Sequence, residues 1–147
     1  MMQSSILLVD DDVDILDSIK MILEAENYTV HTAVDADQAR VFVLEKAVKL
    51  VIMDFIFSEC TGDQLIRDLK KIDESFSIIF LSGWPQVINA VRELEFEVYR
   101  VFLKPVDPEI LLSAIKSIFT EYVDPYEFLD TRQIVSELVP SLYPSEK

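Results

Sequence analysis

The sequence predicts an α/β protein with a doubly wound, five-stranded parallel sheet and five helices. Apolar runs of strand length alternate five times with stretches of helical periodicity along the chain. The strand runs are continuously apolar rather than alternating, which is typical of strands that are buried on both faces. Polar residues follow directly after four of these runs, at the carboxyl edge where such sheets bind ligands.

Five runs have the length and composition of buried strands: residues 6–9, 28–34, 50–53, 78–81 and 98–103. Each is followed by apolar residues at helical spacing, over residues 15–23, 39–43, 65–72, 87–94 and 110–119. We interpret Asp12 as the cap of the first helix. Asp35 with Gln38 has the capping-box pattern that opens the second helix. Asp107 with Pro108 has the cap and the first-turn proline that open the fifth helix.

The C-terminal segment, residues 124–147, is too short for a second domain, so we expect one main domain over residues 4–123. Asp130 with Gln133 repeats the capping-box pattern, and Pro140 would stop a helix. The apolar residues between them lie at helical spacing: Ile134, Val135, Leu138 and Val139. We therefore predict one short amphipathic helix in this C-terminal extension.

Composition excludes several classes of function. The 147 residues include 13 basic and 27 acidic side chains, for a net charge of −14. This charge argues against binding to nucleic acid or to anionic membranes, because phosphate neutralisation needs a basic face. The single cysteine, Cys60, rules out an intrachain disulfide and fits a reducing compartment. Neither a signal peptide nor a membrane span is evident, so we expect a cytoplasmic protein.

Carboxylates gather at the predicted ligand edge of the sheet. Asp10 and Asp11 follow the first strand, and Asp54 follows the third. Two such charges about 4 Å apart repel by roughly 4 kcal/mol at an effective dielectric of about 20. Water, protons or a bound cation must offset this repulsion. An oxygen-rich site without histidine suits Mg²⁺, which keeps water ligands and shares phosphate oxygens.

Two further polar groups follow the fourth and fifth strands. Ser82 offers a hydroxyl to a phosphoryl oxygen, and Lys104 offers a compact, mobile positive charge to the same group. A carboxylate, a dication, a hydroxyl and an ammonium group are together the parts needed for phosphoryl transfer to an aspartate.

The motifs "LLVDDD", "LVIMDF", "IIFLSG" and "FLKPVD" occur in this order, with Gly62 eight residues after Asp54. In these motifs and their order, the chain resembles the receiver domains of two-component response regulators, from residue 4 to about residue 123. The resemblance implies a flavodoxin-like receiver fold. It also implies a signalling module that is controlled by phosphorylation, rather than an enzyme.

The resemblance also implies a role for each site residue. Asp54 would be the phosphoacceptor, and Asp10, Asp11, Asp54 and the backbone carbonyl of Ile56 would bind Mg²⁺. Ser82 would be the switch hydroxyl, and Lys104 would contact the phosphoryl group. The donor would be a phosphohistidine on a sensor histidine kinase or a histidine phosphotransfer protein. A downstream protein target would recognise the surface that changes on phosphorylation. Whether the chain forms a homodimer is left open.

Three departures from the family pattern concern the output rather than the chemistry. Phe57 and Ser58 stand where receivers usually carry a Met-Pro pair. Val101 replaces the switch aromatic, and the neighbouring Phe102 should face the other side of its strand. The sequence "FEVY" replaces the usual Gly-Ala ahead of the fifth strand. These departures support an alternative hypothesis, a degenerate receiver that acts as a constitutive protein-interaction module.

Two other classes of protein fit this sequence less well. An aspartate-nucleophile magnesium phosphatase would carry a second aspartate where this chain has Ile56. A flavodoxin-like cofactor binder would place a phosphate without a cation at the first loop, where three aspartates would repel it. Of the remaining notable residues, His31 is interpreted as structural and Cys60 as an incidental thiol. The two glycines, Gly62 and Gly83, are expected where a side chain does not fit, Gly83 beside the phosphoryl group.

Overall fold

A computed structural model describes residues 4–57 and 60–120. In this part of the chain, five strands and five helices alternate as the sequence predicts. The strands are β1 (Ser5–Val9), β2 (Thr29–Ala33), β3 (Val48–Asp54), β4 (Ser77–Ser82) and β5 (Arg100–Leu103). The helices are α1 (Val13–Ala25), α2 (Ala36–Glu45), α3 (Gly62–Ile72), α4 (Val87–Arg92) and α5 (Pro108–Phe119).

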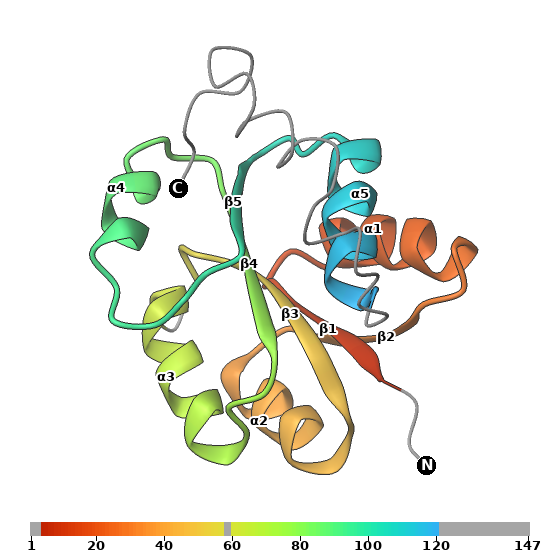
Figure 1. The fold of residues 1–147 in the computed structure, drawn as a ribbon, viewed down its shortest axis with the longest axis horizontal. Coiled ribbons are helices and arrows are strands. Elements are labelled where there is room, and N and C mark those ends of the chain that lie inside the picture. Colours follow the sequence, from red (N-terminus) through yellow and green to blue (C-terminus); the bar gives the residue numbers. More distant parts are fainter. Residues whose placement is uncertain (1–3, 58–59, 121–147) are drawn as a thin grey trace, which may run out of the picture.

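The strands form one fully parallel sheet in the order β2-β1-β3-β4-β5 (Figure 1). The chain therefore winds outward from β1 in one direction and then returns past it in the other. The order reverses between β1 and β3, so the carboxyl ends of these two strands flank the point where such sheets bind ligands. This doubly wound fold confirms the predicted fold class.

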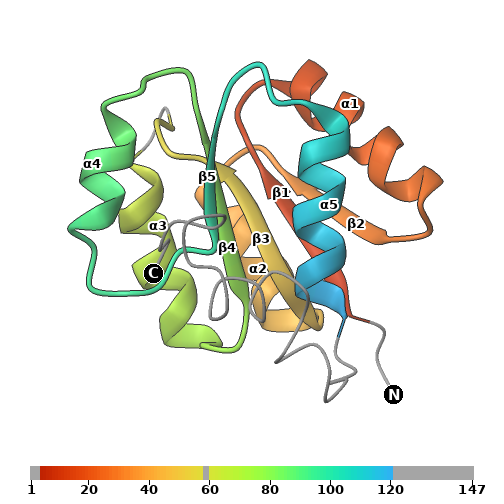
Figure 2. The same cartoon turned by 45° about the horizontal axis from the view of Figure 1, so that its top comes forward.

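Alternate residues of the inner strands supply two separate cores, which explains why the strand runs are continuously apolar. One core contains Leu7, Val51 and Phe80 and is covered by α2, α3 and α4. The other contains Leu8 and Ile52 and is covered by α1 and α5. Figure 2 shows α1 and α5 on one side of the sheet and α3 and α4 on the other.

The predicted helix starts are confirmed where the sequence carries an aspartate cap. The carboxylate of Asp12 accepts hydrogen bonds from the first-turn amides of α1, and Asp107 does the same for α5. At α2, Asp35 accepts from the amide of Gln38, whose side-chain oxygen accepts from the amide of Val34. Each cap satisfies amides that have no partner within the helix.

The two edge strands and α4 are shorter than predicted. β2 spans Thr29–Ala33 rather than 28–34, and β5 begins at Arg100 rather than at residue 98. α4 ends at Arg92, after only six residues, and buries a single side chain, Val87. The predicted helix in residues 124–147 lies outside the described residues. Within the described part, no helix has the length and apolarity needed to cross a membrane.

Candidate functional site

The fold brings the carboxyl ends of four strands to one edge of the sheet. Asp10 directly follows β1, Asp54 is the last residue of β3 and Ser82 is the last residue of β4. Lys104 directly follows β5, and its amide donates to the carbonyl of Ser82. The parallel pairing of β1, β3, β4 and β5 therefore gathers residues that are up to 94 positions apart in the sequence.

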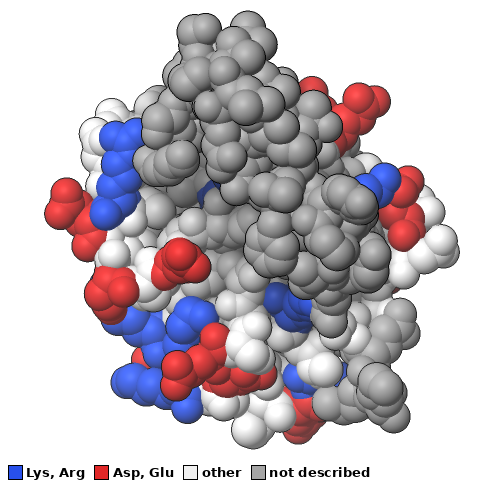
Figure 3. Space-filling model, in the orientation of Figure 1, with Lys and Arg blue, Asp and Glu red and all other residues white. Residues whose placement is uncertain are grey.

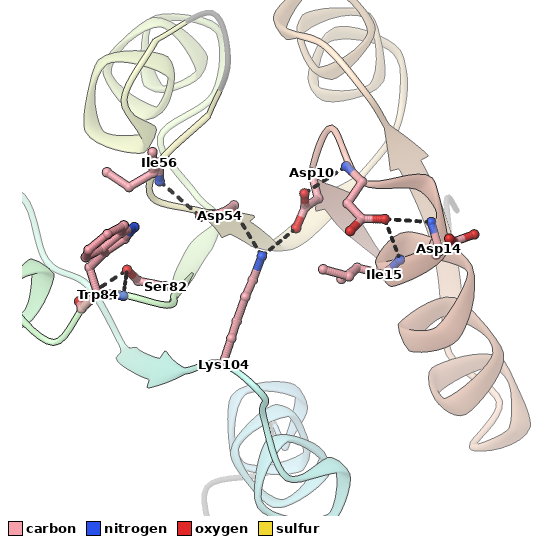
Figure 4. Close-up of polar contacts among 9 residues, drawn as sticks. Asp10, Asp14, Ile15, Asp54, Ile56, Ser82, Trp84 and Lys104 are labelled. Atoms are coloured by element: carbon pink, nitrogen blue, oxygen red, sulfur yellow. Dashed lines mark hydrogen bonds and ion pairs between the residues drawn. The ribbon is translucent and has the colours of Figure 1, made fainter.

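Lys104 joins the two carboxylates at the centre of this edge (Figure 4). Its Nζ lies 2.7 Å from Oδ2 of Asp54 and 3.1 Å from Oδ2 of Asp10. The carboxylate of Asp10 is 4% exposed, that of Asp54 15% and the Lys104 side chain 23%. The remaining oxygens are held by backbone amides, Oδ1 of Asp10 by residue 12 and Oδ1 of Asp54 by Ile56.

Burial sets the electrostatics of this cluster. It raises the pKa of Asp10, and the nearby Asp54 charge adds to this, against the lowering effects of the Asp12 amide and of Lys104. Burial alone would lower the pKa of Lys104, but its hydrogen bonds to Asp54 and Asp10 raise it above its ordinary value. One ammonium group therefore does not fully offset the two carboxylates, and the site favours additional positive charge.

The donor set at this edge fits Mg²⁺. Asp10 and Asp54 present oxygens to a common point that already holds a cationic group, which is the environment that a small hard cation prefers. Asp11 is exposed at the mouth of the site. Among residues 4–57 and 60–120, however, no group of three or more acidic, histidine or cysteine side chains is already gathered around one point. Full coordination would rest on water and backbone oxygens as well as on carboxylates.

Ser82 is fully buried at the end of β4, on the side of Asp54 away from Asp10 (Figure 4). Its Oγ accepts from the amide of Trp84 at 2.9 Å and donates to the carbonyl of Trp84 at 3.3 Å. Because a serine hydroxyl has a single hydrogen, Ser82 releases the Trp84 carbonyl whenever it donates to another acceptor. The Trp84 side chain itself is 61% exposed.

The loop after Asp54 is anchored in a way that the sequence did not suggest. Phe57, which with Ser58 stands where receivers usually carry a Met-Pro pair, is 6% exposed and belongs to the core beneath α2, α3 and α4. Phe55 packs edge-on against Phe80, with ring centroids 5.0 Å apart. The amide of Thr61 donates to the side-chain oxygen of Gln64 at the start of α3. The T-x-x-Q spacing of this capping box was a detectable sequence signal.

The two glycines differ, and one of the predictions about them is wrong. A Cβ at Gly62 would lie 2.8 Å from a ring carbon of Phe80 and 3.0 Å from Cα of Phe55, so no side chain fits there. A Cβ at Gly83 would meet no atom within 4 Å, and no described glycine has a positive φ. Gly83 is exposed, so a side chain there would extend into open space.

Val101 and Phe102 face opposite sides of β5, as strand geometry predicts. Val101 packs against the core under α4, and Phe102 packs against the core under α5. Phe102 therefore does not substitute for the missing aromatic. His31 stacks on Phe42 with ring centroids 4.8 Å apart, in β2, which fits its interpretation as a structural residue.

Comparison with known proteins finds a matching family model, similar curated proteins and similar solved structures. A family model described as the response regulator receiver domain matches residues 6–116. The transcriptional regulatory protein GlrR of Escherichia coli is 36% identical over 111 residues, which cover 75% of this chain and 25% of GlrR. The CpxR homologue of Haemophilus influenzae is 26% identical over 133 residues, which cover 90% of this chain and 58% of that protein. This chain thus spans about a quarter to three fifths of these curated relatives.

Solved structures of similar chains have the same fold. A CheY-like receiver domain protein from Methanospirillum hungatei is 32% identical with a TM-score of 0.71, covering 80% of this chain and 93% of that one. The receiver domain of NtrX from Brucella abortus is 28% identical with a TM-score of 0.72, covering 80% of this chain and all of that one.

Proposed function

This chain belongs to the response regulator receiver domain family, and on that basis we propose that it accepts a phosphoryl group on Asp54. The observation that carries the proposal is the contact of Lys104 with both Asp54 and Asp10. An ammonium group in this position neutralises charge on the carboxylates and is placed to contact a phosphoryl group bound to Asp54.

In the proposed reaction, a carboxylate oxygen of Asp54 attacks the phosphorus of a phosphohistidine. The new P–O bond forms as the P–N bond to the imidazole breaks, and the leaving imidazole takes up a proton. Lys104 stabilises negative charge on the phosphoryl oxygens, and Ser82 donates its hydroxyl hydrogen to one of them. That donation releases the carbonyl of Trp84, so the loop between β4 and α4 would change when Asp54 is phosphorylated.

Receivers of this family generally bind Mg²⁺, which neutralises phosphoryl charge during transfer. In this chain, Asp10, Asp11 and Asp54 would supply carboxylate ligands, and the carbonyl of Ile56 a backbone ligand. The raised pKa of Asp10 supports this assignment, because a buried carboxylate with an incompletely offset charge favours a bound cation.

The partners proposed for this chain follow from the same chemistry. The phosphodonor would be a sensor histidine kinase or a histidine phosphotransfer protein. A downstream protein would recognise the surface that changes on phosphorylation. The competing proposal, a degenerate receiver that binds partners constitutively, has its support in Val101 and in the unusual loop at Phe57.

Intact mass spectrometry after incubation with a small acyl phosphate and Mg²⁺ tests the proposal. We expect the native chain to gain the mass of one phosphoryl group and Asp54→Asn to gain none. Asp12→Asn is the matched control, because asparagine also caps helices and Asp12 lies at the same edge without contacting Lys104. Failure of the native chain to gain phosphate, with the fold intact, would favour the constitutive interaction module.

A further inference from the structure

Helix α4 buries the fewest side chains of the five described helices. Val87 is its single buried residue, whereas α3 buries Leu65, Ile66 and Leu69 in the same core. Figures 1 and 2 show α3 and α4 side by side on one face of the sheet. We call residues 83–99, which join β4 to β5, the α4 segment. Because its helix is weakly packed, the polar contacts at its two ends gain importance.

The first set of polar contacts holds the start of the α4 segment, beside Asp54. The hydroxyl of Ser82 donates to the carbonyl of Trp84 at 3.3 Å (Figure 4). The same carbonyl accepts from the amide of Val87, the first residue of α4, at 3.1 Å. Ser82 is therefore bonded to the turn from which α4 begins, and a change in its hydrogen-bond partner acts on the start of the helix.

The second set of polar contacts holds the end of the α4 segment on α3. Arg67 of α3 donates to both carboxylate oxygens of Glu95, from Nε at 2.6 Å and from Nη2 at 3.1 Å. Its Nη1 donates to Asp63, one turn earlier in α3, at 2.9 Å. The guanidinium also lies 5.9 Å from the centroid of the Phe96 ring. We call these contacts the Arg67 clamp. Figure 3 shows blue and red side chains close together at the lower left, in the region of α3.

The geometry of the Arg67 clamp ties it to one position of the α4 segment. Two parallel N–H···O bonds form only when the guanidinium and the carboxylate are aligned, and the bond to Asp63 fixes the guanidinium on α3. The hydrogen bonds from Arg67 also lower the pKa of Glu95 to about 2, so this carboxylate stays ionised. A movement of the end of the segment relative to α3 therefore breaks the pairing of Arg67 with Glu95.

We propose that the Arg67 clamp holds the α4 segment in its unphosphorylated position and opposes rearrangement of the segment when Asp54 is phosphorylated. This inference rests on the proposed function, in which Ser82 releases the Trp84 carbonyl and donates to a phosphoryl oxygen. The clamp is formed while Ser82 still bonds to Trp84, and an interaction made in one of two states favours that state. Loss of the clamp should therefore make the phosphorylated arrangement easier to reach.

Titration of the ¹⁵N-labelled full-length chain with beryllofluoride and Mg²⁺, which together mimic a phosphorylated aspartate, tests the proposal. Arg67→Gln and Glu95→Gln should each lower the half-saturating concentration of beryllofluoride about two- to fivefold, the range expected for one exposed ion pair. The double variant should bind no more tightly than the single ones, because both substitutions remove the same pairing. The two substitutions change the net charge in opposite directions, so a common effect does not come from charge alone. Unchanged or weaker binding in either single variant would overturn the proposal.

Arg40→Gln is the matched control. The side chain of Arg40 is 41% exposed and that of Arg67 40%. Arg40 also joins a carboxylate on its own helix, Asp37, to a carboxylate on another helix, Asp68, but it connects α2 to α3 rather than to the α4 segment. Its loss should leave the half-saturating concentration unchanged. An equal effect in Arg40→Gln and Arg67→Gln would mean that the clamp has no special role.

A second measurement needs no phosphoryl mimic. In Arg67→Gln without beryllofluoride, the amide signals of residues 84–92 should move along the line between their positions in the free and the saturated native chain, because the variant populates the rearranged state. Shifts confined to the neighbourhood of residues 63, 67 and 95 would mean that the ion pair acts only locally, and would overturn the proposal. A native chain that does not respond to beryllofluoride would overturn the proposed function together with this inference. A native chain that responds, with variants that bind like it, would overturn this inference alone.

Discussion

Lys104 contacts the carboxylates of both Asp54 and Asp10, so these three side chains lie together at the carboxyl edge of the sheet. The side chains on the other side of Asp54 are less usual. Ile56 is 47% exposed and Trp84 61% exposed, and they lie on the side of Asp54 away from Asp10 (Figure 4). By family resemblance, these two positions border the path by which water reaches the phosphoryl group. Neither side chain orients a water molecule as an amide or a carboxylate does.

We therefore predict a long-lived phosphoaspartate. The double variant Ile56→Asn with Trp84→Glu should lose phosphate about 10- to 100-fold faster than the native chain, a difference of about 1.4–2.8 kcal/mol in the barrier. The measurement is the decay of the phosphorylated mass after removal of the donor. Val41→Asn with Leu44→Glu is the matched control, because it makes similar changes at exposed apolar sites on α2. Equal decay in both double variants would falsify the role of Ile56 and Trp84 in slowing the loss of phosphate.

His31 gives a pH-dependent contribution to stability with a definite sign. Burial, with help from Lys46 and Lys20, lowers the pKa of His31 below its ordinary value of 6.5. The unfolded chain then binds the proton more readily than the folded chain between the lowered pKa and about pH 6.5. The free energy of unfolding should therefore decrease as the pH falls through this window, and recover as the pH rises.

Titration of the imidazole signal by NMR checks this prediction, and the chain has only one histidine to assign. The titration midpoint should lie below 6.5. In urea unfolding experiments at pH 5 and pH 7, His31→Gln should reduce the difference in stability between the two values. A midpoint at or above 6.5 would contradict the burial argument.

Among the structural elements, the connection between β3 and α3 is tightly packed beside Asp54. The amide of Gly62 donates to the carbonyl of Phe55, which closes the loop over the edge-on pair of Phe55 and Phe80. Phe57 inserts into the core from the same loop. The loop that follows Asp54 is thus held by apolar contacts rather than by a proline, and its position depends on the space at Gly62.

A pair of glycine substitutions tests this dependence. Gly62→Ala should destabilise the fold by about 1–3 kcal/mol, because its Cβ overlaps Phe80 and Phe55. Gly83→Ala should change stability by less than about 0.5 kcal/mol, because its Cβ meets open space. Urea-induced unfolding of the two variants gives both numbers. Equal effects at the two positions would mean that the loop yields to an extra methyl group, and that packing does not hold it.

For the whole molecule, the charge at the acidic edge of the sheet affects the stability of the fold. The folded-state pKa of Asp10 is raised above 3.8, so the folded chain holds this proton more tightly than the unfolded chain. Its contribution favours folding at low pH and is lost as the pH rises through the folded-state pKa. At neutral pH without divalent cations, the ionised carboxylate destabilises the fold.

We therefore predict that Asp10→Asn raises the free energy of unfolding in the absence of Mg²⁺ and abolishes stabilisation by Mg²⁺. In the native chain, Mg²⁺ at 100 times its dissociation constant should add about 2.7 kcal/mol. Thermal unfolding with and without Mg²⁺ measures both effects. Trp84 fluorescence provides an independent readout, which should respond to Mg²⁺ with a phosphoryl mimic and respond less in Asp11→Asn. An Asp10→Asn chain that is less stable than the native one without metal would contradict the electrostatic argument.

Much of the fold was predictable, because the signals that specify it are local. Five continuous apolar runs and helical periodicity indicate a parallel sheet covered on both faces, and Asp12, Asp35 and Asp107 mark helix starts by bonding to amides within three residues. Chain order also places Asp10, Asp54, Ser82 and Lys104 at the carboxyl ends of strands. The lengths of β5 and α4 were not predictable, because edge elements depend on how much of their surface neighbouring elements cover.

What the chain order could not provide is the set of contacts between residues that are distant in sequence. That Phe57 is a core residue, that Gly83 has free space around it and that Lys104 reaches both carboxylates each depend on the packing of several elements at once. A residue's type indicates what it can bind, and its place after a strand indicates the edge where it lies. The distances that give Lys104 its two partners arise only when β1, β3 and β5 are assembled in one sheet.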